Sequence, residues 1–335
     1  MSDFRVLLAS GAEHLRQRFE ELGYQVYSSD TNFDGTHFFP NSDLYVRIAQ
    51  VRELENQRVA VIQSCTGSSP AAKEFYSTSD RVQELMLLLD ILKHPVEVKK
   101  LGHKEYETKP LSPPSSIDVV LTHQPFSLQD KAFRTGEAVS SRSVMRSIAR
   151  LCDRLWFVEP LADVDVPWVE ELADKGKYEV IRITPELIGH AATIFGFDDY
   201  VLTAPDEGAQ RRFNVPGFSK RRSDSFTIDM HGELDVAGKN VIVLDDLTKT
   251  GTTLIRAANM LRKQGAIDVG LVVLHVTPIR DQGERLLDDL ISRSGGKIVT
   301  SNTVYSVAFC EKHPRLSYDI VDKLVEHLQQ FGTAE

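Results

Sequence analysis

The stretch Val241-Ile-Val-Leu-Asp-Asp-Leu-Thr-Lys-Thr-Gly-Thr-Thr-Leu254 decides the fold class of this chain. Its four leading apolar residues predict a buried parallel strand, and a helical pattern runs from Leu254 to Gln264. Two acids and a short threonine-rich loop around Gly251 separate them. Strand, loop and helix in this order are typical of an open α/β sheet, in which ligands bind at the carboxyl ends of the strands.

The same stretch carries groups that suit a phosphorylated sugar. The carboxylates of Asp245 and Asp246 can accept hydrogen bonds from two vicinal sugar hydroxyls. Loop hydroxyls and backbone N–H groups, together with the partial positive charge of the helix N-terminus, can bind a phosphate. The loop residues concerned are Thr248, Thr250, Gly251, Thr252 and Thr253. An ordinary turn with a capping Asp or Thr is the alternative, but two adjacent acids before this loop favour a ribose 5-phosphate site.

Composition sets limits on the class of protein. A length of 335 residues predicts two domains of ordinary size, and 41% apolar residues suffice for two cores. The net charge of −9 argues against a nucleic-acid-binding scaffold, because no broad cationic face is available. No stretch approaches the length of a membrane span. We therefore expect no nucleic acid and no membrane among the partners.

The cysteines and the first residues bear on the compartment. Cys65, Cys152 and Cys310 lie far apart with no C-x-x-C spacing, so neither a structural zinc site nor a disulfide framework is expected. The start Met1-Ser-Asp-Phe-Arg5 lacks the apolar core of a secretory signal. Both features favour a cytoplasmic protein.

Strands and helices are expected to alternate along the whole chain. This alternation predicts an α/β protein with two mainly parallel sheets, each flanked by helices. We place the domains at 1–160 and 161–335. The last helix of the chain is a candidate to pack back on the first domain. Residues 94–116 hold four prolines and many charges, which indicates an excursion or loop outside the core. The expected strands are 4–9, 26–28, 44–48, 59–63, 117–122, 155–159, 180–183, 200–204, 241–244, 269–276 and 297–301, and the expected helices include 79–93, 140–152, 168–175, 185–195, 254–264 and 317–331.

Three shorter segments each allow two interpretations, one functional and one purely structural. Asp206 follows a strand and precedes small residues, so it is either a divalent-metal ligand beside a pyrophosphate or a helix N-cap. Lys220 and Arg222 lie in a compact cationic cluster after Pro-Gly, which is either a phosphoryl clamp on a mobile loop or a solvated surface loop. His275 ends an apolar strand and is either a hydrogen-bonded strand-end residue or a catalyst.

Taken in order, the segments resemble those of the ribose-phosphate pyrophosphokinase family, also called phosphoribosyl pyrophosphate synthetases. The resemblance covers about residues 38–328. In the first half, F-x-D-G-E-I is similar to Phe39-Pro-Asn-Ser-Asp-Leu44, and R-Q-D-R-x-x-x-x-G-E-x-I-S is similar to Leu128-Gln-Asp-Lys-Ala-Phe-Arg-Thr-Gly-Glu-Ala-Val-Ser140. In the second half, S-P-D-x-G-G, K-R-R and D-D-x-x-x-T-x-G-T are similar to Ala204-Pro-Asp-Glu-Gly-Ala209, Lys220-Arg-Arg222 and Asp245-Asp-Leu-Thr-Lys-Thr-Gly-Thr-Thr253.

The resemblance implies two tandem type I phosphoribosyltransferase-like domains and a transfer of pyrophosphate from ATP to the anomeric hydroxyl of ribose 5-phosphate. It implies Mg²⁺ as cofactor, held by Asp206, and a homo-oligomer working in nucleotide biosynthesis. Lys220 and Arg222 would be catalytic, and the ribose phosphate would lie on the loop after Asp245. The nucleotide would contact Phe39, Asn41, Asp43, Gln129, Asp130 and Lys131.

The first half departs from the family pattern. Leu161 stands where the family has a metal-binding His, and Leu128 replaces the leading Arg of the nucleotide segment. Glu159 or Asp163 would be the nearest replacements for the lost ligand. Residues 94–116 look inserted. Two alternatives therefore stay open: a phosphoribosyltransferase that consumes phosphoribosyl pyrophosphate, and a non-catalytic regulatory subunit. A larger 5-substituted ribose as acceptor is a variant of the pyrophosphate-transfer hypothesis.

Overall fold

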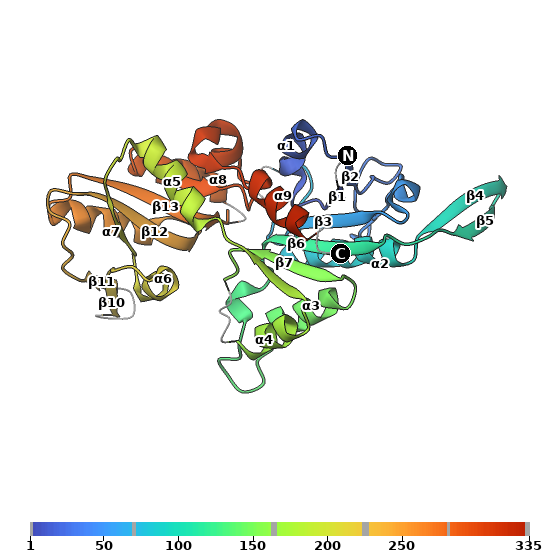
Figure 1. Ribbon diagram of the computed structural model, residues 1–335, viewed down its shortest axis with the longest axis horizontal. Coiled ribbons are helices and arrows are strands. Elements are labelled where there is room, and N and C mark those ends of the chain that lie inside the picture. Colours follow the sequence, from blue (N-terminus) through green and yellow to red (C-terminus); the bar gives the residue numbers. More distant parts are fainter. Residues whose placement is uncertain (1–2, 69–71, 162–165, 223–227, 280–281, 332–335) are drawn as a thin grey trace. The chain divides into compact units, whose positions relative to one another are not determined.

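The computed structural model describes residues 3–68, 72–161, 166–222, 228–279 and 282–331. The chain divides into two compact units. Unit 1 contains Met1–Ser68, Ala72–Arg182 and Val321–Glu335, and unit 2 contains Ile183–Ile320. Each unit is an α/β layer structure, and both are seen in Figure 1.

Unit 1 is built on a six-stranded parallel sheet with the order β2-β1-β3-β6-β7-β8. The central strands are continuous apolar runs because helices cover both faces of such a sheet. Within β6, for example, residues 117–123 are all buried. The strands are β1 (Arg5–Leu8), β2 (Val26–Ser28), β3 (Arg58–Ser64), β6 (Ser116–His123), β7 (Arg154–Val158) and β8 (Tyr178–Ile181).

Amphipathic helices supply the rest of the unit 1 core. In α2, Ser77 and Asp80 form a capping box, and Leu85, Leu88 and Leu92 pack against the sheet. The helices are α1 (Arg16–Glu21), α2 (Thr78–Lys93), α3 (Ser140–Ala149), α4 (Pro167–Asp174) and α9 (Val321–Gln330), with short turns η1 (Glu13–Leu15), η2 (Val51–Leu54) and η3 (Ser127–Gln129).

Unit 2 has a five-stranded parallel sheet with the order β15-β14-β13-β12-β9, and β10 and β11 form a separate antiparallel hairpin. Its strands are β9 (Val201–Thr203), β10 (Ser219–Arg222), β11 (Ile228–His231), β12 (Asn240–Thr248), β13 (Asp268–Val276), β14 (Ile298–Ser301) and β15 (Ser317–Tyr318). Its helices are α5 (Thr184–Phe195), α6 (Glu207–Phe213), α7 (Thr252–Lys263), α8 (Gly283–Arg293), η4 (Val307–Lys312) and η5 (Pro314–Leu316).

The predicted α/β class with two parallel sheets is confirmed, two local predictions are wrong, and a third is refined. Residues 44–48 form only one isolated bridge, between Phe38 and Leu44, because the chain there closes a tight loop. The last helix starts at Val321 rather than at residue 317, since Ser317–Tyr318 pairs with β14. Residues 94–116 lie outside the core as expected but contain a regular hairpin, β4 (Val96–Gly102) and β5 (Glu105–Pro110).

Strand pairing explains which residues belong to unit 1. Because β8 pairs with β7, residues 166–182 belong to unit 1. The last helix also lies there: the Arg58 guanidinium donates to the Leu328 carbonyl at 2.7 Å, and the rings of Trp156 and Phe331 meet edge to face at 4.9 Å. Unit 1 is therefore assembled from both ends of the chain.

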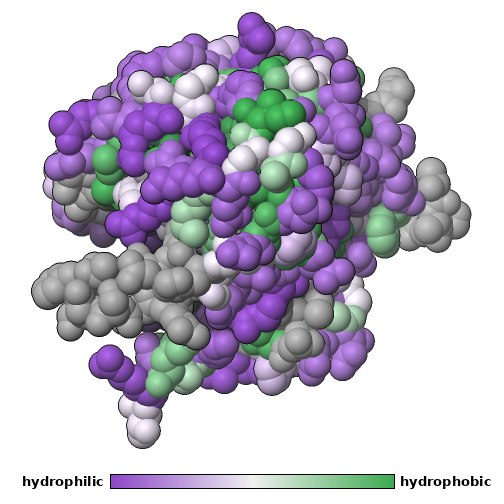
Figure 2. All heavy atoms as spheres, turned by 90° about the vertical axis from the view of Figure 1, so that its left-hand side faces the viewer, coloured by the Kyte–Doolittle hydropathy of each residue, from purple (hydrophilic) through white to green (hydrophobic). Residues whose placement is uncertain are grey.

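The surface is polar over most of the face that the space-filling view of Figure 2 presents. The face shown in Figure 2 is mainly hydrophilic, with small hydrophobic patches between polar areas. Among the described residues, no helix is both long enough and apolar enough to cross a membrane.

Candidate active site

The candidate phosphate loop of unit 2 begins inside a strand. β12 continues through Asp245 and Asp246 to Thr248, because its pairing with β13 extends as far as Thr248 and Val276. The helix α7 then begins at Thr252, two residues earlier than predicted. The connecting loop is therefore only Lys249–Gly251, and Thr252 and Thr253 lie in the first turn of the helix. All seven residues predicted for the sugar phosphate thus lie within one continuous segment.

Gly251 makes this short connection possible. Its φ of +66° lies in the left-handed region, which disfavours any residue with a Cβ. A Cβ built on Gly251 would stand 2.2 Å from Leu290 Cδ1, a buried side chain of α8. Conformation and space therefore both require glycine at this position.

The loop hydroxyls hold the turn and face the start of the helix. Thr248 Oγ1 accepts the Gly251 N–H at 3.0 Å, and the hydroxyls of Thr250 and Thr252 are 3.1 Å apart. Gly251 at the N-cap of α7 has no capping side chain, and the Thr252 N–H meets the Thr250 hydroxyl at 3.5 Å, the long limit of a hydrogen bond. The first-turn N–H groups of a helix lack intrahelical partners, so this end is suited to an anion.

Asp206, Arg212 and Asp246 form an electrostatic cluster beside the loop. Asp206 caps α6, with its Oδ1 accepting the N–H groups of Gly208 and Ala209 at 3.0 and 3.1 Å. Burial raises the pKa of Asp246, Arg212 opposes that rise, and Asp206 adds to it. The N-cap reading of Asp206 is thus observed, and the carboxylate also lies within electrostatic reach of Asp246.

Arg212 was not among the residues singled out from the sequence. It follows Asp206 by six positions in α6, and its proximity to Asp246 comes from packing between α6 and β12. The signal available in the sequence was only a pair of arginines at a helix C-terminus, which is common on surfaces.

The carboxylates beside the loop meet part of what Mg²⁺ needs. Within the described ranges, no group of three or more His, Cys, Asp or Glu side chains could hold a metal by itself. Mg²⁺ is commonly bound through one or two carboxylates plus substrate phosphates. Asp206 and Asp246 supply two like charges that a cation would relieve. The residues fit Mg²⁺ carried with a phosphate, not Mg²⁺ in an all-protein cage.

The cationic cluster lies on a strand. Residues 219–222 form β10, with Lys220 paired to Met230 and Arg222 paired to Ile228 of β11. The predicted mobile loop is therefore a hairpin at this point. The side chains of Lys220 and Arg222 lie outside the described part of the structure, so their roles stay predictions.

In unit 1, the predicted nucleotide residues Phe39, Asn41 and Asp43 lie on one tight, exposed loop. The Asn41 amide donates to the Asp43 carboxylate at 2.6 Å, and the Asp43 carbonyl accepts the Phe39 N–H at 2.8 Å. The Phe39 ring is 40% exposed and contacts Tyr45 edge to face at 5.7 Å. The loop presents an aromatic ring and two polar side chains together.

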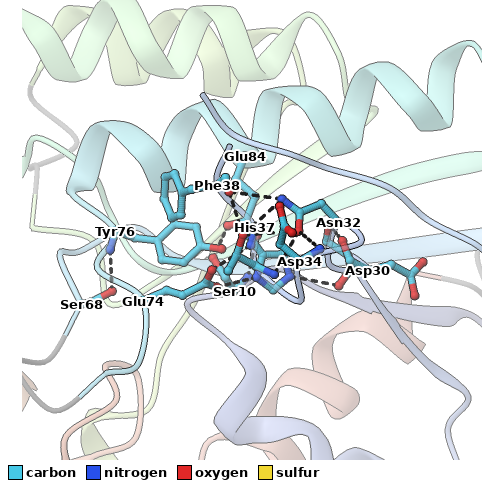
Figure 3. A network of polar contacts seen from close by, with 12 residues as sticks. Ser10, Asp30, Asn32, Asp34, His37, Phe38, Ser68, Glu74, Tyr76 and Glu84 are labelled. Atoms are coloured by element: carbon cyan, nitrogen blue, oxygen red, sulfur yellow. Dashed lines mark hydrogen bonds and ion pairs between the residues drawn. The ribbon is translucent and has the colours of Figure 1, made fainter. Parts of the chain in front are cut away.

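A polar network anchors the base of this loop, as Figure 3 shows. Glu74 binds His37 twice, accepting its backbone N–H at 2.8 Å and lying 2.7 Å from its Nδ1. The next residue, Phe38, packs on Tyr76 with ring centres 4.9 Å apart. The guanidinium carbon of Arg81 lies over the Tyr76 ring, 4.2 Å from the ring centre. Sequence reasoning missed His37 and Glu74, because their pairing joins segments 37 positions apart.

Gln129, Asp130 and Lys131 occupy a second loop of unit 1, after β6. Gln129 Oε1 accepts the Ser140 hydroxyl at 2.7 Å, and the Asp130 carbonyl accepts the Trp168 indole N–H at 3.0 Å. Lys131 Nζ lies 5.6 Å from the centre of the Phe133 ring. Contacts with Ser140 at the start of α3 and with Trp168 of α4 thus fix the position of this loop.

The family resemblance puts Leu161 at the position of a metal-binding His, and the nearby acid Glu159 is already paired. Glu159 is buried, has a φ of +45°, and meets the Arg182 guanidinium at 3.0 Å. Asp163 lies outside the described residues.

His275 is a buried strand-end residue whose Nδ1 is 2.8 Å from Thr303 Oγ1, in line with the interpretation as a hydrogen-bonded residue.

Known proteins similar to this chain settle its family. The model of the phosphoribosyl transferase domain matches residues 200–313. A ribose-phosphate pyrophosphokinase from Methanosarcina mazei is 30% identical over 264 residues, covering 74% of both chains. This chain belongs to the ribose-phosphate pyrophosphokinase family. It is a transferase-type enzyme of that family, as the resemblance implied.

Two further relatives extend the agreement over the whole length. A ribose-phosphate pyrophosphokinase from Thermococcus kodakarensis is 26% identical over 308 residues, covering 89% of this chain and 93% of the relative. A phosphoribosylpyrophosphate synthetase structure from Mycobacterium smegmatis matches with a TM-score of 0.69 at 22% identity and covers 98% of both chains. The pyrophosphokinase family fold therefore spans both units.

Proposed function

We propose that this protein transfers the pyrophosphoryl group of ATP to ribose 5-phosphate, giving phosphoribosyl pyrophosphate and AMP. The anomeric hydroxyl forms a bond to the β-phosphorus, the bond from that phosphorus to the AMP oxygen breaks, and the hydroxyl proton is released. The observation that carries the proposal is the segment Asp245–Thr253, with its acids, its hydroxyl-lined loop and a helix start with glycine at the N-cap, in a chain of this family.

Each group in unit 2 has a role in this scheme. Asp245 and Asp246 bind the 2- and 3-hydroxyls of the ribose, and Thr248, Thr250, Gly251, Thr252 and Thr253 bind the 5-phosphate. Lys220 and Arg222 neutralise charge on the moving phosphoryl group, since electrostatic stabilisation supplies most of the catalysis in phosphoryl transfer. Mg²⁺, held at Asp206 with the donor phosphates, would withdraw charge from those phosphates.

The donor nucleotide is assigned to the two loops of unit 1. The Phe39 ring offers a stacking surface, and Asn41 and Asp43 offer hydrogen-bonding groups beside it. Gln129, Asp130 and Lys131 would contact the nucleotide and its phosphates. The reaction places the protein in nucleotide biosynthesis, and the cysteine pattern agrees with a cytoplasmic enzyme.

The test is product analysis by ³¹P NMR with ATP, Mg²⁺ and a panel of ribose phosphates that includes larger 5-substituted riboses. AMP and phosphoribosyl pyrophosphate in equal amounts are the expected products. Pyrophosphate release from added phosphoribosyl pyrophosphate and a base, with no AMP under any metal condition, would instead identify a phosphoribosyltransferase.

A regulatory subunit is the second candidate, and Leu161 is the observation that favours it. The family's metal-binding His is missing there, and the adjacent Glu159 is engaged by Arg182. A protein that binds ribose 5-phosphate in calorimetry, forms no AMP alone and stimulates an active family member would fit this candidate and not the enzyme.

A further inference from the structure

The hairpin formed by β4 and β5 has no covering element. Every residue in Val96–Leu101 and Glu105–Pro110 is exposed. Within the described ranges no third strand joins it, so both outer edges of this two-stranded sheet are unpaired. Figure 1 shows it extending away from the rest of unit 1. It occupies the segment that looked inserted relative to the family pattern.

The two faces of the hairpin differ in character. One face carries opposite charges directly across the strands, Glu97 against Lys109 and Lys99 against Glu107. The base of that face is tied to η2 by an ion pair between Arg52 and Glu97. The other face carries Val96, Val98 and Tyr106, exposed by 45%, 57% and 61%, with Lys100 and Thr108 beside them. Side chains alternate along a strand, so this segregation reflects the sequence pattern itself.

An uncovered hairpin of this kind is unfavourable as a free element. Two-stranded sheets are marginal in water, and independent stability generally needs a third strand or a packed face. Unpaired strand edges beside an apolar surface are also the usual sites of contact with another chain. The hairpin is thus expected to gain strands from a partner.

We propose that the outer edge of β4 pairs antiparallel with β4 of a second copy of this chain, about a twofold axis at Val98. In this register each Glu97 faces Lys99 of the other copy, so one contact creates two opposite-charge pairs. Val96 lies opposite the aliphatic stem of Lys100, and the two Val98 side chains meet at the axis. The result is a continuous four-stranded sheet.

The charge pattern selects this partner and this register. Lysines on an exposed strand ordinarily oppose edge pairing. Here an acid two positions before a lysine makes the strand complementary to itself in the antiparallel sense, as an isologous interface requires. Opposite charges across strands favour pairing, and like charges placed opposite oppose it.

The edge of β5 is less suited to the same contact. β5 ends at Pro110, which has no N–H to donate to a ladder. Further, β4 runs outward over seven residues, about 24 Å at 3.4 Å per residue. Antiparallel pairing of two such strands places the two copies of unit 1 at opposite ends of the shared sheet.

Cysteine cross-linking tests the register without substrate. Residues opposite each other across antiparallel strands have Cα atoms about 4.5–5.5 Å apart, which suits a disulfide. Val98→Cys should therefore form a covalent dimer under mild oxidation about tenfold faster than Thr108→Cys. Thr108 is the matched control because it lies directly opposite Val98 on β5 and on the same face. The parent chain, in which Cys65 and Cys152 are buried and Cys310 is half-buried, measures the background.

Charge reversal gives an independent measurement by sedimentation velocity. Glu97→Lys and Lys99→Glu should each weaken the association, because each homodimer then contains two like-charge pairs. An equimolar mixture of the two variants should associate again, since both intermolecular pairs become opposite in sign. Each variant keeps its own repulsion within the hairpin, so only contact between copies explains the recovery.

Two results would overturn the proposal. One is equal cross-linking rates for the two cysteine variants. The other is a mixture of the charge variants that stays as dissociated as each variant alone. Neither result depends on the catalytic proposal, because no substrate is present.

Discussion

At the scale of single residues, Gly251 determines the geometry of the candidate phosphate loop. It ends the β12 connection in the left-handed region and lets α8 approach through Leu290. The helix can then start at Thr252 with no capping side chain at Gly251 and one long contact, 3.5 Å, between the Thr252 N–H and the Thr250 hydroxyl. Backbone conformation and close packing therefore act together at this one position.

Gly251→Ala is expected to destabilise unit 2 by about 2–4 kcal/mol, from left-handed strain plus overpacking against Leu290. Hydrogen exchange of peptides from β12 and α7 measures the effect. Gly189→Ala is the control: Gly189 lies within α5 with open space around a built Cβ and no positive φ, so alanine should stabilise it by about 0.5–1 kcal/mol. Equal exchange rates in both variants would contradict the role given to Gly251.

Lys220→Ala is expected to lower kcat about a hundredfold or more, because a positioned charge on a transferring phosphoryl group is lost. The substrate KM values should change much less. Lys239→Ala is the matched control, since Lys239 forms an exposed pair with Asp235 elsewhere in unit 2. Steady-state kinetics with AMP as readout measure both, and wild-type turnover in Lys220→Ala would remove this residue from the mechanism.

At the scale of elements, an ion pair joins the starts of two neighbouring strands of unit 2. Asp268 begins β13, and Lys297, which directly precedes β14, pairs with it. Burial alone would raise the pKa of Asp268, but the Lys297 hydrogen bond and the Val269 N–H together hold it below the ordinary value of 3.8. This contact joins the ends of two parallel strands that pair further along.

The sign of the pKa shift gives the pH dependence. A carboxyl with a lowered folded-state pKa stabilises the fold fully above its unfolded value and loses that contribution as pH falls through the folded value. Asp268→Asn should therefore lower the unfolding free energy of unit 2 by about 0.5–1 kcal/mol at pH 7, a size that allows for partial exposure of the pair. The difference should shrink as pH falls below 3.8. Urea titrations of the parent protein and of Asp268→Asn, followed by circular dichroism at pH 7 and below pH 3.8, test this. A difference in unfolding free energy that does not change with pH would contradict it.

At the scale of the whole molecule, unit 1 is closed by the end of the chain. Helix α9 buries Val321, Leu324 and Leu328 completely, and Arg18 binds Asp322 at 2.8 Å. Unit 1 therefore cannot complete its core until residues more than 300 positions from its first strand have joined it.

Truncation after Ile320 is expected to destabilise unit 1 by several kcal/mol, since three apolar side chains lose their burial. Tryptophan fluorescence reports on unit 1 alone, because Trp156 and Trp168, the two tryptophans of the chain, both lie there. The fluorescence transition should move to lower urea, while hydrogen exchange in β12 and β13 of unit 2 should stay unchanged. Truncation after Phe331 is the control, and an equal loss there would contradict the role of α9.

The sequence alone determined the class of each unit and the chemistry of the segment 241–254. Apolar runs, alternation and turn residues act over a few positions, so the starts of the strand and of the helix were predictable there to within two residues, whereas β12 ends at Thr248 and not at the predicted Leu244. The family resemblance singled out Phe39, Asn41 and Asp43, and the structure places them on one loop. Local patterns suffice where neighbours in sequence are neighbours in space.

Tertiary structure alone decided what depends on distant segments. The pairing of His37 with Glu74, the approach of Arg212 to Asp246, and the return of α9 to unit 1 join residues that no periodicity relates. The ordering of residues 96–110 into a hairpin likewise follows from cross-strand pairing and not from its proline-rich composition. Such contacts form only when the chain closes large loops, and local sequence carries no information on which loops close.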